Sequence, residues 1–168
     1  MEVRSFTDGL PVRRERPGPP VRLRLADGLL DATQTALRDG SAGRRESTVL
    51  WAGRPLDGST ALVSHLLLPA FRSRRDFLTI PMDERIAIAG YLRSERLLAF
   101  ADLHTHPRRA FLSEPDRARP FSRRDGFYAV VIPDFGTRDA GAGWRFYEAC
   151  TGDWHEVEPS GRVDAWPV

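Results

Sequence analysis

The chain has 168 residues, of which 41% are apolar and 29% charged, and this composition is typical of one soluble globular domain with a buried core. A net charge of +2 gives no sign of a nucleic-acid-binding surface, and no apolar run approaches the ~18 residues of a membrane span. Cys150 is the single cysteine, so an internal disulfide and a cysteine-based zinc site are excluded. Because the first residues also lack the apolar block of a signal peptide, we expect a cytoplasmic protein without nucleic-acid or membrane partners.

The first part of the chain changes from an extended to a helical pattern. Residues 1–19 include a proline- and arginine-rich run and are predicted to form an extended arm. In residues 21–25 apolar and arginine side chains alternate, which favours a half-buried strand. A helical apolar period follows from Asp27. Gly40 is expected to end that helix, because glycine readily adopts the left-handed conformation that follows many helices.

The next segment is expected to add two strands and a second helix. Residues 47–53 and 61–68 are apolar runs of strand length, and residues 69–81 are predicted to form an irregular, arginine-rich connection. Pro81, with two acidic residues just behind it, is typical of the first turn of a helix. That helix is expected to place its buried side at Ile86, Ala89, Tyr91 and Leu92.

The second half of the chain is predicted to consist mostly of strands. Residues 97–103 form a strand that leads into His104, and residues 107–125 form an irregular loop whose length is typical of functional loops. The apolar run 127–132 is a further strand, and residues 144–157 form a hairpin that turns at Thr151-Gly152-Asp153.

Together these elements predict one α/β (α+β) domain over residues 20–158, between the arm and a C-terminal tail at 159–168. The order strand, helix, two strands, helix and then mostly strands favours one main mixed sheet flanked by about two helices. No internal repeat appears, so a repeat architecture is not expected.

Metal-ligating residue types gather at the end of one predicted strand. In an extended backbone His104 and His106 point to the same side, and Asp116 follows a short loop later. Two imidazoles and one carboxylate form a three-ligand zinc site with a fourth position for water. Glu46, at the start of a separate strand, is the kind of carboxylate that takes a proton from such a water.

This pattern resembles the signature of a known family. Glu46 with Val49-Leu50-Trp51-Ala52-Gly53, then His104-Thr105-His106-Pro107, then Ser113-x-x-Asp116 are similar to the JAMM signature of the MPN (JAB/Mov34/PAD-1) zinc metalloproteases. The segment 126–136 is similar to bacterial members, which are associated with operons that also encode ubiquitin-like proteins and E1- and E2-like enzymes. The resemblance covers roughly residues 20–158.

The resemblance implies an MPN/JAB-like fold with a curved central sheet and a zinc-dependent peptidase or isopeptidase activity. It implies that His104, His106 and Asp116 bind Zn²⁺. It also implies that Glu46 is the general base and acid, and that Ser113 donates a hydrogen bond to the developing oxyanion.

The implied substrate is the peptide or isopeptide bond after the C-terminal tail of a ubiquitin-like protein, in a conjugate or in a precursor. E1- and E2-like proteins of the same operon are the implied further partners. An extended tail needs a groove, and residues 69–81 and 107–125 are the segments placed to form one.

The aspartate ligand has a competitor within the chain, because Ser122-Arg123-Arg124-Asp125 repeats the Ser-x-x-Asp spacing. Asp116 is favoured over Asp125, which requires a longer excursion from the histidines and immediately precedes a strand. Ligands must converge to about 2 Å from the metal, so the shorter excursion fits better.

Two other functions remain as alternatives. Asp102-Leu103-His104-Thr105-His106 is also similar to the first metal motif of PHP-type phosphoesterases and amidohydrolases, but the 62 residues after His106 are too few for their barrel. A catalytically silent MPN scaffold or binding module is the second alternative, although it has no need of the retained ligands. A nucleobase deaminase is excluded, because it requires a Cys-x-x-Cys pair.

Overall fold

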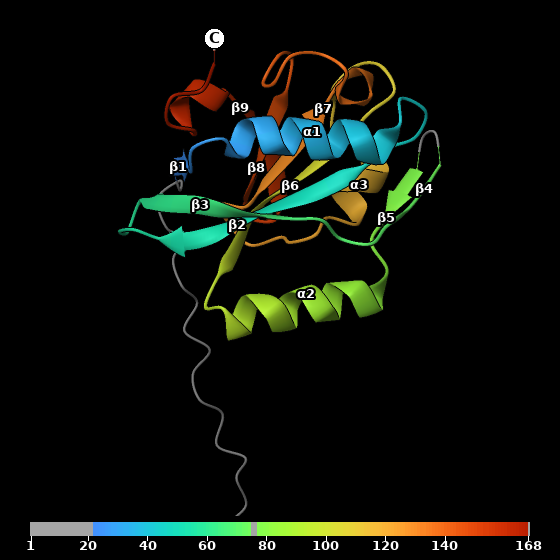
Figure 1. Cartoon of the computed structure of the whole chain (residues 1–168). Helices are drawn as coiled ribbons and strands as arrows, with labels where there is room; N and C mark the ends of the chain where they lie inside the picture. The colour runs from blue at the N-terminus through green and yellow to red at the C-terminus, as the bar shows by residue number, and fades with distance from the viewer. Residues whose placement is uncertain (1–21, 75–76, 168) are drawn as a thin grey trace, which may run out of the picture.

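The computed structural model describes residues 22–74 and 77–167, and its centre is a seven-stranded mixed sheet (Figure 1). The helices are α1 (Leu29–Ser41), α2 (Met82–Ser94) and the short α3 (Glu114–Ala118). The strands of the sheet are β1 (Arg22–Leu25), β2 (Thr48–Pro55), β3 (Thr60–Leu67), β6 (Leu98–Thr105), β7 (Tyr128–Ile132), β8 (Arg145–Cys150) and β9 (Asp153–Val157). They lie in the order β1-β3-β2-β6-β7-β8-β9, in which β1 is parallel to β3, β6 is parallel to β7, and the other neighbours are antiparallel.

Helices cover both faces of the sheet, α1 on one face and α2 on the other (Figure 1). The central strand β2 therefore contributes to two cores. Val49 and Trp51 pack in the cluster that includes α1, whereas Leu50 and Ala52 pack in the cluster that includes α2. A strand that is buried on both faces has an uninterrupted apolar sequence. The predicted α+β class, with a mixed central sheet and flanking helices, is confirmed.

Helix α1 extends one residue beyond Gly40, so the prediction that this glycine ends the helix is wrong. The left-handed residue after the helix is Ala42, with φ 46°. Gly40 is required for a different reason, since a Cβ atom placed on it would lie 3.1 Å from the Cβ atom of Ser47. The missing side chain allows α1 to pass unusually close to the segment that enters β2.

Helix α2 buries only one of the four residues predicted for its buried side. Leu92 is buried as predicted, together with Ile88, whereas Ile86, Ala89 and Tyr91 are exposed. Apolar residues are spread around this helix, so its sequence does not identify a single face. The buried positions lie one turn apart and pack with Leu50 of the sheet and with Leu97, which immediately precedes β6.

Two predicted loops contain regular structure. The connection 69–81 includes a two-stranded hairpin, β4 (Arg72–Arg74) and β5 (Phe77–Thr79). The loop 107–125 includes α3. These elements are short, and short elements leave little periodic signal in a sequence.

The predicted arm at 1–19 lies outside the described residues. Residues 159–167, expected as a tail, lie against the domain: Val163 is buried and forms a bridge with Leu23, and the Trp166 ring contacts Trp144 and Phe146. Within the described part of the chain, no helix has both the length and the apolar character needed to cross a membrane.

Candidate metal centre

The two histidines are held at the C-terminal end of β6. His104 pairs with Thr48 in β2 and with Val131 in β7. His106 lies just past the strand, but its backbone stays aligned because its N–H donates to the carbonyl of Ile132 at 2.8 Å. Both side chains are buried, and their ring centroids are 5.2 Å apart. The spacing of two residues therefore places both imidazoles on one side of the backbone, as the sequence predicts.

Ser113 and Asp116 are brought together by the N-terminus of α3. Ser113 is the N-cap of this helix, and its backbone N–H and hydroxyl donate to Oδ2 of Asp116 at 2.9 and 2.5 Å. The N–H of Asp116 donates in return to the serine Oγ at 3.4 Å. This is a capping box, in which residues three apart satisfy each other's polar groups. The Ser-x-x-Asp spacing thus has a local structural cause.

The capping box delivers a carboxylate oxygen to the two imidazoles. Oδ2 of Asp116 lies 3.5 Å from Nε2 of His104 and 3.3 Å from Nε2 of His106. Ligands bound tetrahedrally to zinc at ~2.0–2.1 Å lie about 3.3–3.4 Å from one another, so these separations fit one shared ion. In addition, Nε2 of His104 is buried without a hydrogen-bond partner, which is costly for a polar atom unless a ligand satisfies it. These three residues therefore fit a metal ion, and a His₂-carboxylate donor set suits Zn²⁺.

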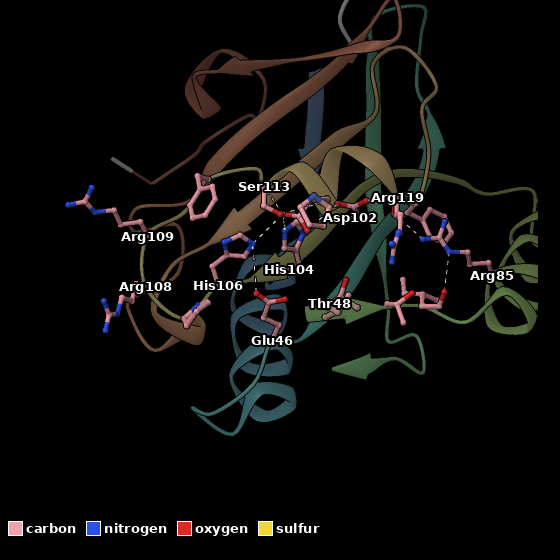
Figure 2. A pocket seen from close by; sticks show the side chains of 18 residues that line it. Glu46, Thr48, Arg85, Asp102, His104, His106, Arg108, Arg109, Ser113 and Arg119 are labelled. Carbon is pink, nitrogen blue, oxygen red and sulfur yellow. Dashed lines mark hydrogen bonds and ion pairs between the residues drawn. The ribbon is translucent and has the colours of Figure 1, made fainter. Parts of the chain in front are cut away.

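Glu46 reaches the same place from a separate part of the chain. Its Oε1 lies 4.0 Å from Nε2 of His106, and the side chain is buried. The position is set by the next residue, because Ser47 N–H donates to Thr105 Oγ1 at 2.9 Å and Thr105 N–H donates to the Ser47 carbonyl at 3.0 Å. Figure 2 shows the two imidazoles between Glu46 on one side and Ser113 on the other.

Asp102 is a further buried carboxylate at the site, and sequence analysis assigned it no role. It precedes His104 by two residues on β6, and its Oδ1 lies 3.9 Å from Nδ1 of that histidine. Its Oδ2 accepts a hydrogen bond from the backbone N–H of Phe121 at 3.1 Å. The sequence signal that could have identified Asp102 is an acidic residue within the otherwise apolar predicted strand at 97–103.

The electrostatics of the site favour a cation. Burial alone would raise the pKa of Asp116, but interactions with His104 and His106 hold it well below its usual range. Burial alone would lower the pKa of His104, but Asp116 and Asp102 raise it. Burial raises the pKa of the Asp102 carboxyl, against the opposing effect of His104. With Glu46, three carboxyl groups surround two imidazoles, and a divalent ion compensates such a concentration of negative charge.

The site opens into a cavity of about 330 Å³. Residues from both predicted groove segments line it, among them Ile80 from the connection 69–81 and Phe111 from the loop 107–125. The Phe111 ring meets that of His106 edge-on, with centroids 5.1 Å apart. In Figure 2, the arginine pair Arg85 and Arg119 and the pair Arg108 and Arg109 lie at opposite ends of the cavity, with the histidines between them.

The structure separates Asp125 from the histidines. Oδ1 of Asp125 accepts a hydrogen bond from the N–H of Thr151 at 2.8 Å, in the turn between β8 and β9. Among the described residues, the acidic, histidine and cysteine side chains that converge closely enough to share an ion are His104, His106 and Asp116. The open sheet also differs from the barrel that the PHP-type and amidohydrolase alternative requires.

Comparisons with known proteins also find a likeness to a metalloprotease. No protein-family model matches the chain. The chain is similar to a probable metalloprotease of Sinorhizobium fredii, with 26% identity over 110 residues that span 63% of this chain and 67% of the relative. It is also similar to a protein of Desulfitobacterium hafniense solved in solution, with a TM-score of 0.61 and 16% identity over 81% of this chain and 90% of that chain. A JAB1/MPN domain protein from Archaeoglobus fulgidus aligns with a TM-score of 0.46 and 18% identity, over 85% of this chain and 98% of that chain.

The Sinorhizobium relative supplies the likeness to a metalloprotease, and the Desulfitobacterium structure supplies the likeness in fold. The likeness to a metalloprotease, which the motif predicts, is confirmed by the Sinorhizobium relative. The chain is thus similar to a metalloprotease, and its candidate metal centre is built from β6 and the N-terminus of α3.

Proposed function

We propose that this protein is a zinc-dependent JAMM-type peptidase or isopeptidase. The observation that carries the proposal is the convergence of His104, His106 and Asp116 beside the buried carboxylate of Glu46. A binding module has no use for a buried base next to three metal ligands, whereas hydrolysis requires both.

In the proposed mechanism His104, His106 and Asp116 hold the ion. Bound zinc would supply a Lewis acid that lowers the pKa of water towards ~7. Glu46 accepts the proton of the attacking water and returns it to the leaving amine, and its burial beside His106 keeps bulk water from competing for that proton.

The hydroxyl of Ser113 is not free to donate to an oxyanion in this structure, because it already donates to Asp116. Its single hydroxyl proton is donated to Asp116, so it must turn away from that carboxylate before it can donate to an oxyanion. A donor aimed at the developing negative charge is typically worth a few kcal/mol of transition-state stabilisation.

The proposed substrate is the bond after the C-terminal tail of a ubiquitin-like protein, with E1- and E2-like proteins as further partners. The cavity supports an extended tail, because β5 leads into its lining at Leu78, Thr79 and Ile80. Among the described residues β5 is paired on one side, by β4. An added strand along its other edge would form main-chain hydrogen bonds and lead the scissile bond towards the histidines.

The test combines zinc analysis with cleavage of ubiquitin that carries a C-terminal aminomethylcoumarin. We expect one zinc ion per chain, and cleavage that a chelator abolishes and added zinc restores. Glu46→Gln should retain zinc but lose about 10²–10⁴-fold in rate, as removal of a general base does. Glu114→Gln, an exposed change of the same chemistry in the first turn of α3, is the matched control.

The outcomes separate the parts of the proposal. Undiminished cleavage by Glu46→Gln, or a wild-type protein without zinc, contradicts the mechanism. Cleavage of casein without cleavage of the ubiquitin substrate contradicts only the ubiquitin-like specificity. Zinc binding without cleavage of either substrate favours the silent scaffold.

A further inference from the structure

Asp102 is a buried carboxylate that the proposed mechanism does not use. Its two oxygens face different partners: Oδ1 lies 3.9 Å from Nδ1 of His104, and Oδ2 accepts the N–H of Phe121 at 3.1 Å. The hydrogen bond from Phe121 occupies one oxygen and holds the orientation of the carboxylate, so the other oxygen remains directed towards the imidazole. In Figure 2 Asp102 lies beside His104 on the wall of the cavity.

The imidazole of His104 must carry its proton on a particular nitrogen if it is to bind a metal. Nε2 is the atom directed towards Asp116, so Nε2 needs its lone pair and the proton belongs on Nδ1. Histidines that bind metals usually donate this second N–H to a carboxylate or carbonyl, which fixes both the tautomer and the orientation of the ring. Oδ1 of Asp102 is an acceptor on that side, and a movement of about 1 Å brings it within hydrogen-bond distance.

The same carboxylate connects two parts of the site. Phe121 follows α3 by three residues, and its ring stacks on that of Phe127 with centroids 6.4 Å apart. Asp102 itself belongs to β6, which holds both histidines. The hydrogen bond from Phe121 therefore ties the segment behind the Asp116 helix to the strand that holds the other two ligands.

We propose that Asp102 is a positioning residue of the metal centre, which holds His104 in the tautomer with an exposed Nε2 lone pair and anchors the segment behind α3 to β6. This inference rests on the metal site of the proposed function. It assigns no contact with the substrate to Asp102, which acts through His104.

Asp102→Asn tests this role because the change is isosteric. It keeps an acceptor at the position of one carboxylate oxygen and places a donor at the position of the other. The N–H of Phe121 requires an acceptor, so the amide oxygen must take the place of Oδ2. The amide NH₂ then takes the place of Oδ1 and points a donor at Nδ1 of His104. That nitrogen must become an acceptor, the proton moves to Nε2, and the metal-binding lone pair is lost.

We expect Asp102→Asn to weaken zinc binding about 10–100-fold, as loss of an outer carboxylate typically does, in competition titrations with a chromogenic chelator. Asp125→Asn is the matched control, since Asp125 also accepts a backbone N–H but lies away from the histidines. Its zinc affinity should equal that of the wild type. Nitrogen-15 NMR of the metal-free proteins, at a pH where the imidazole is neutral, should find the His104 proton on Nδ1 in the wild type and on Nε2 in Asp102→Asn.

The result that overturns the inference is an Asp102→Asn protein whose zinc affinity stays within about twofold of the wild type. A wild-type His104 with its proton on Nε2 overturns it as well, and this measurement holds even if the variant does not fold. If the wild type binds no zinc, the proposed function fails and the inference fails with it. If the wild type binds zinc and Asp102→Asn binds it equally well, the inference fails but the proposed function does not.

Discussion

The close contact between α1 and the segment entering β2 leads us to expect that Gly40→Ala destabilises the protein. Alanine in place of glycine inside a helix is ordinarily stabilising by about 1 kcal/mol. At Gly40 the added Cβ atom would lie 3.1 Å from Cβ of Ser47. Gly90, in the exposed middle of α2, has no heavy atom within 4 Å of the same position and is the matched control.

The magnitude depends on whether Ser47 can retreat. It is 1% exposed, its hydroxyl donates to the carbonyl of Leu37 at 2.6 Å, and its N–H donates to Thr105 at 2.9 Å. A retreat strains these bonds, and overpacking of this kind typically costs about 1–3 kcal/mol. Both variants gain the helix stabilisation of alanine over glycine, but only Gly40→Ala has the cost of overpacking. Gly40→Ala should therefore be less stable than Gly90→Ala by about 1–3 kcal/mol.

Thermal unfolding of both variants in a chelator gives the comparison. For a chain of this length about 2–4 °C corresponds to 1 kcal/mol, so the midpoints should differ by roughly 2–12 °C, with Gly90→Ala above the wild type. A Gly40→Ala protein as stable as Gly90→Ala would refute the reasoning, since it would show that Ser47 yields freely. Glu46 precedes Ser47, so the same displacement should also lower the cleavage rate in Gly40→Ala and leave it unchanged in Gly90→Ala.

Three further predictions concern the ligands and the core. Asp116→Ala should lose zinc while Asp125→Ala retains it, and elemental analysis showing the reverse would identify Asp125 as the ligand. Thr33→Val should lower the free energy of unfolding in urea by about 1–3 kcal/mol, because the buried Trp51 indole N–H loses its acceptor at 2.8 Å; a change below ~0.5 kcal/mol would contradict this. In metal-free protein the lowered pKa of Asp116 means that its carboxylate stabilises the fold above the ordinary value of 3.8 and loses this effect as the pH falls further. The stability difference between wild type and Asp116→Asn should therefore shrink from pH 5 to pH 3, and a constant difference in urea titrations would count against the pairing.

The parts of the site that the sequence determined are those created by neighbours along the chain. His104 and His106 share a side because side chains alternate along an extended backbone. Ser113 and Asp116 meet because a capping box joins residues three apart at the start of a helix. The main strands and the two long helices could also be predicted, because their apolar periods extend over enough residues to be distinctive.

What only the tertiary structure decided involves contacts between distant segments. The buried side of α2 depends on which sheet residues lie beneath it, so Ile88 and Leu92 are buried while Ile86 is exposed. Gly40 has its role because Ser47 lies against it, and nothing local to the helix predicts that neighbour.

Asp102 illustrates the same limit at the metal centre. In the sequence it was part of a motif shared with other hydrolases, and its partner Phe121 lies in a loop without regular period. Local preferences are set by a few adjacent residues, whereas burial and hydrogen-bond partners at this site depend on how β2, β6 and the segment around α3 pack together. The sequence therefore identified the residues that can bind a metal, and the packing of these segments decided which groups hold and orient them.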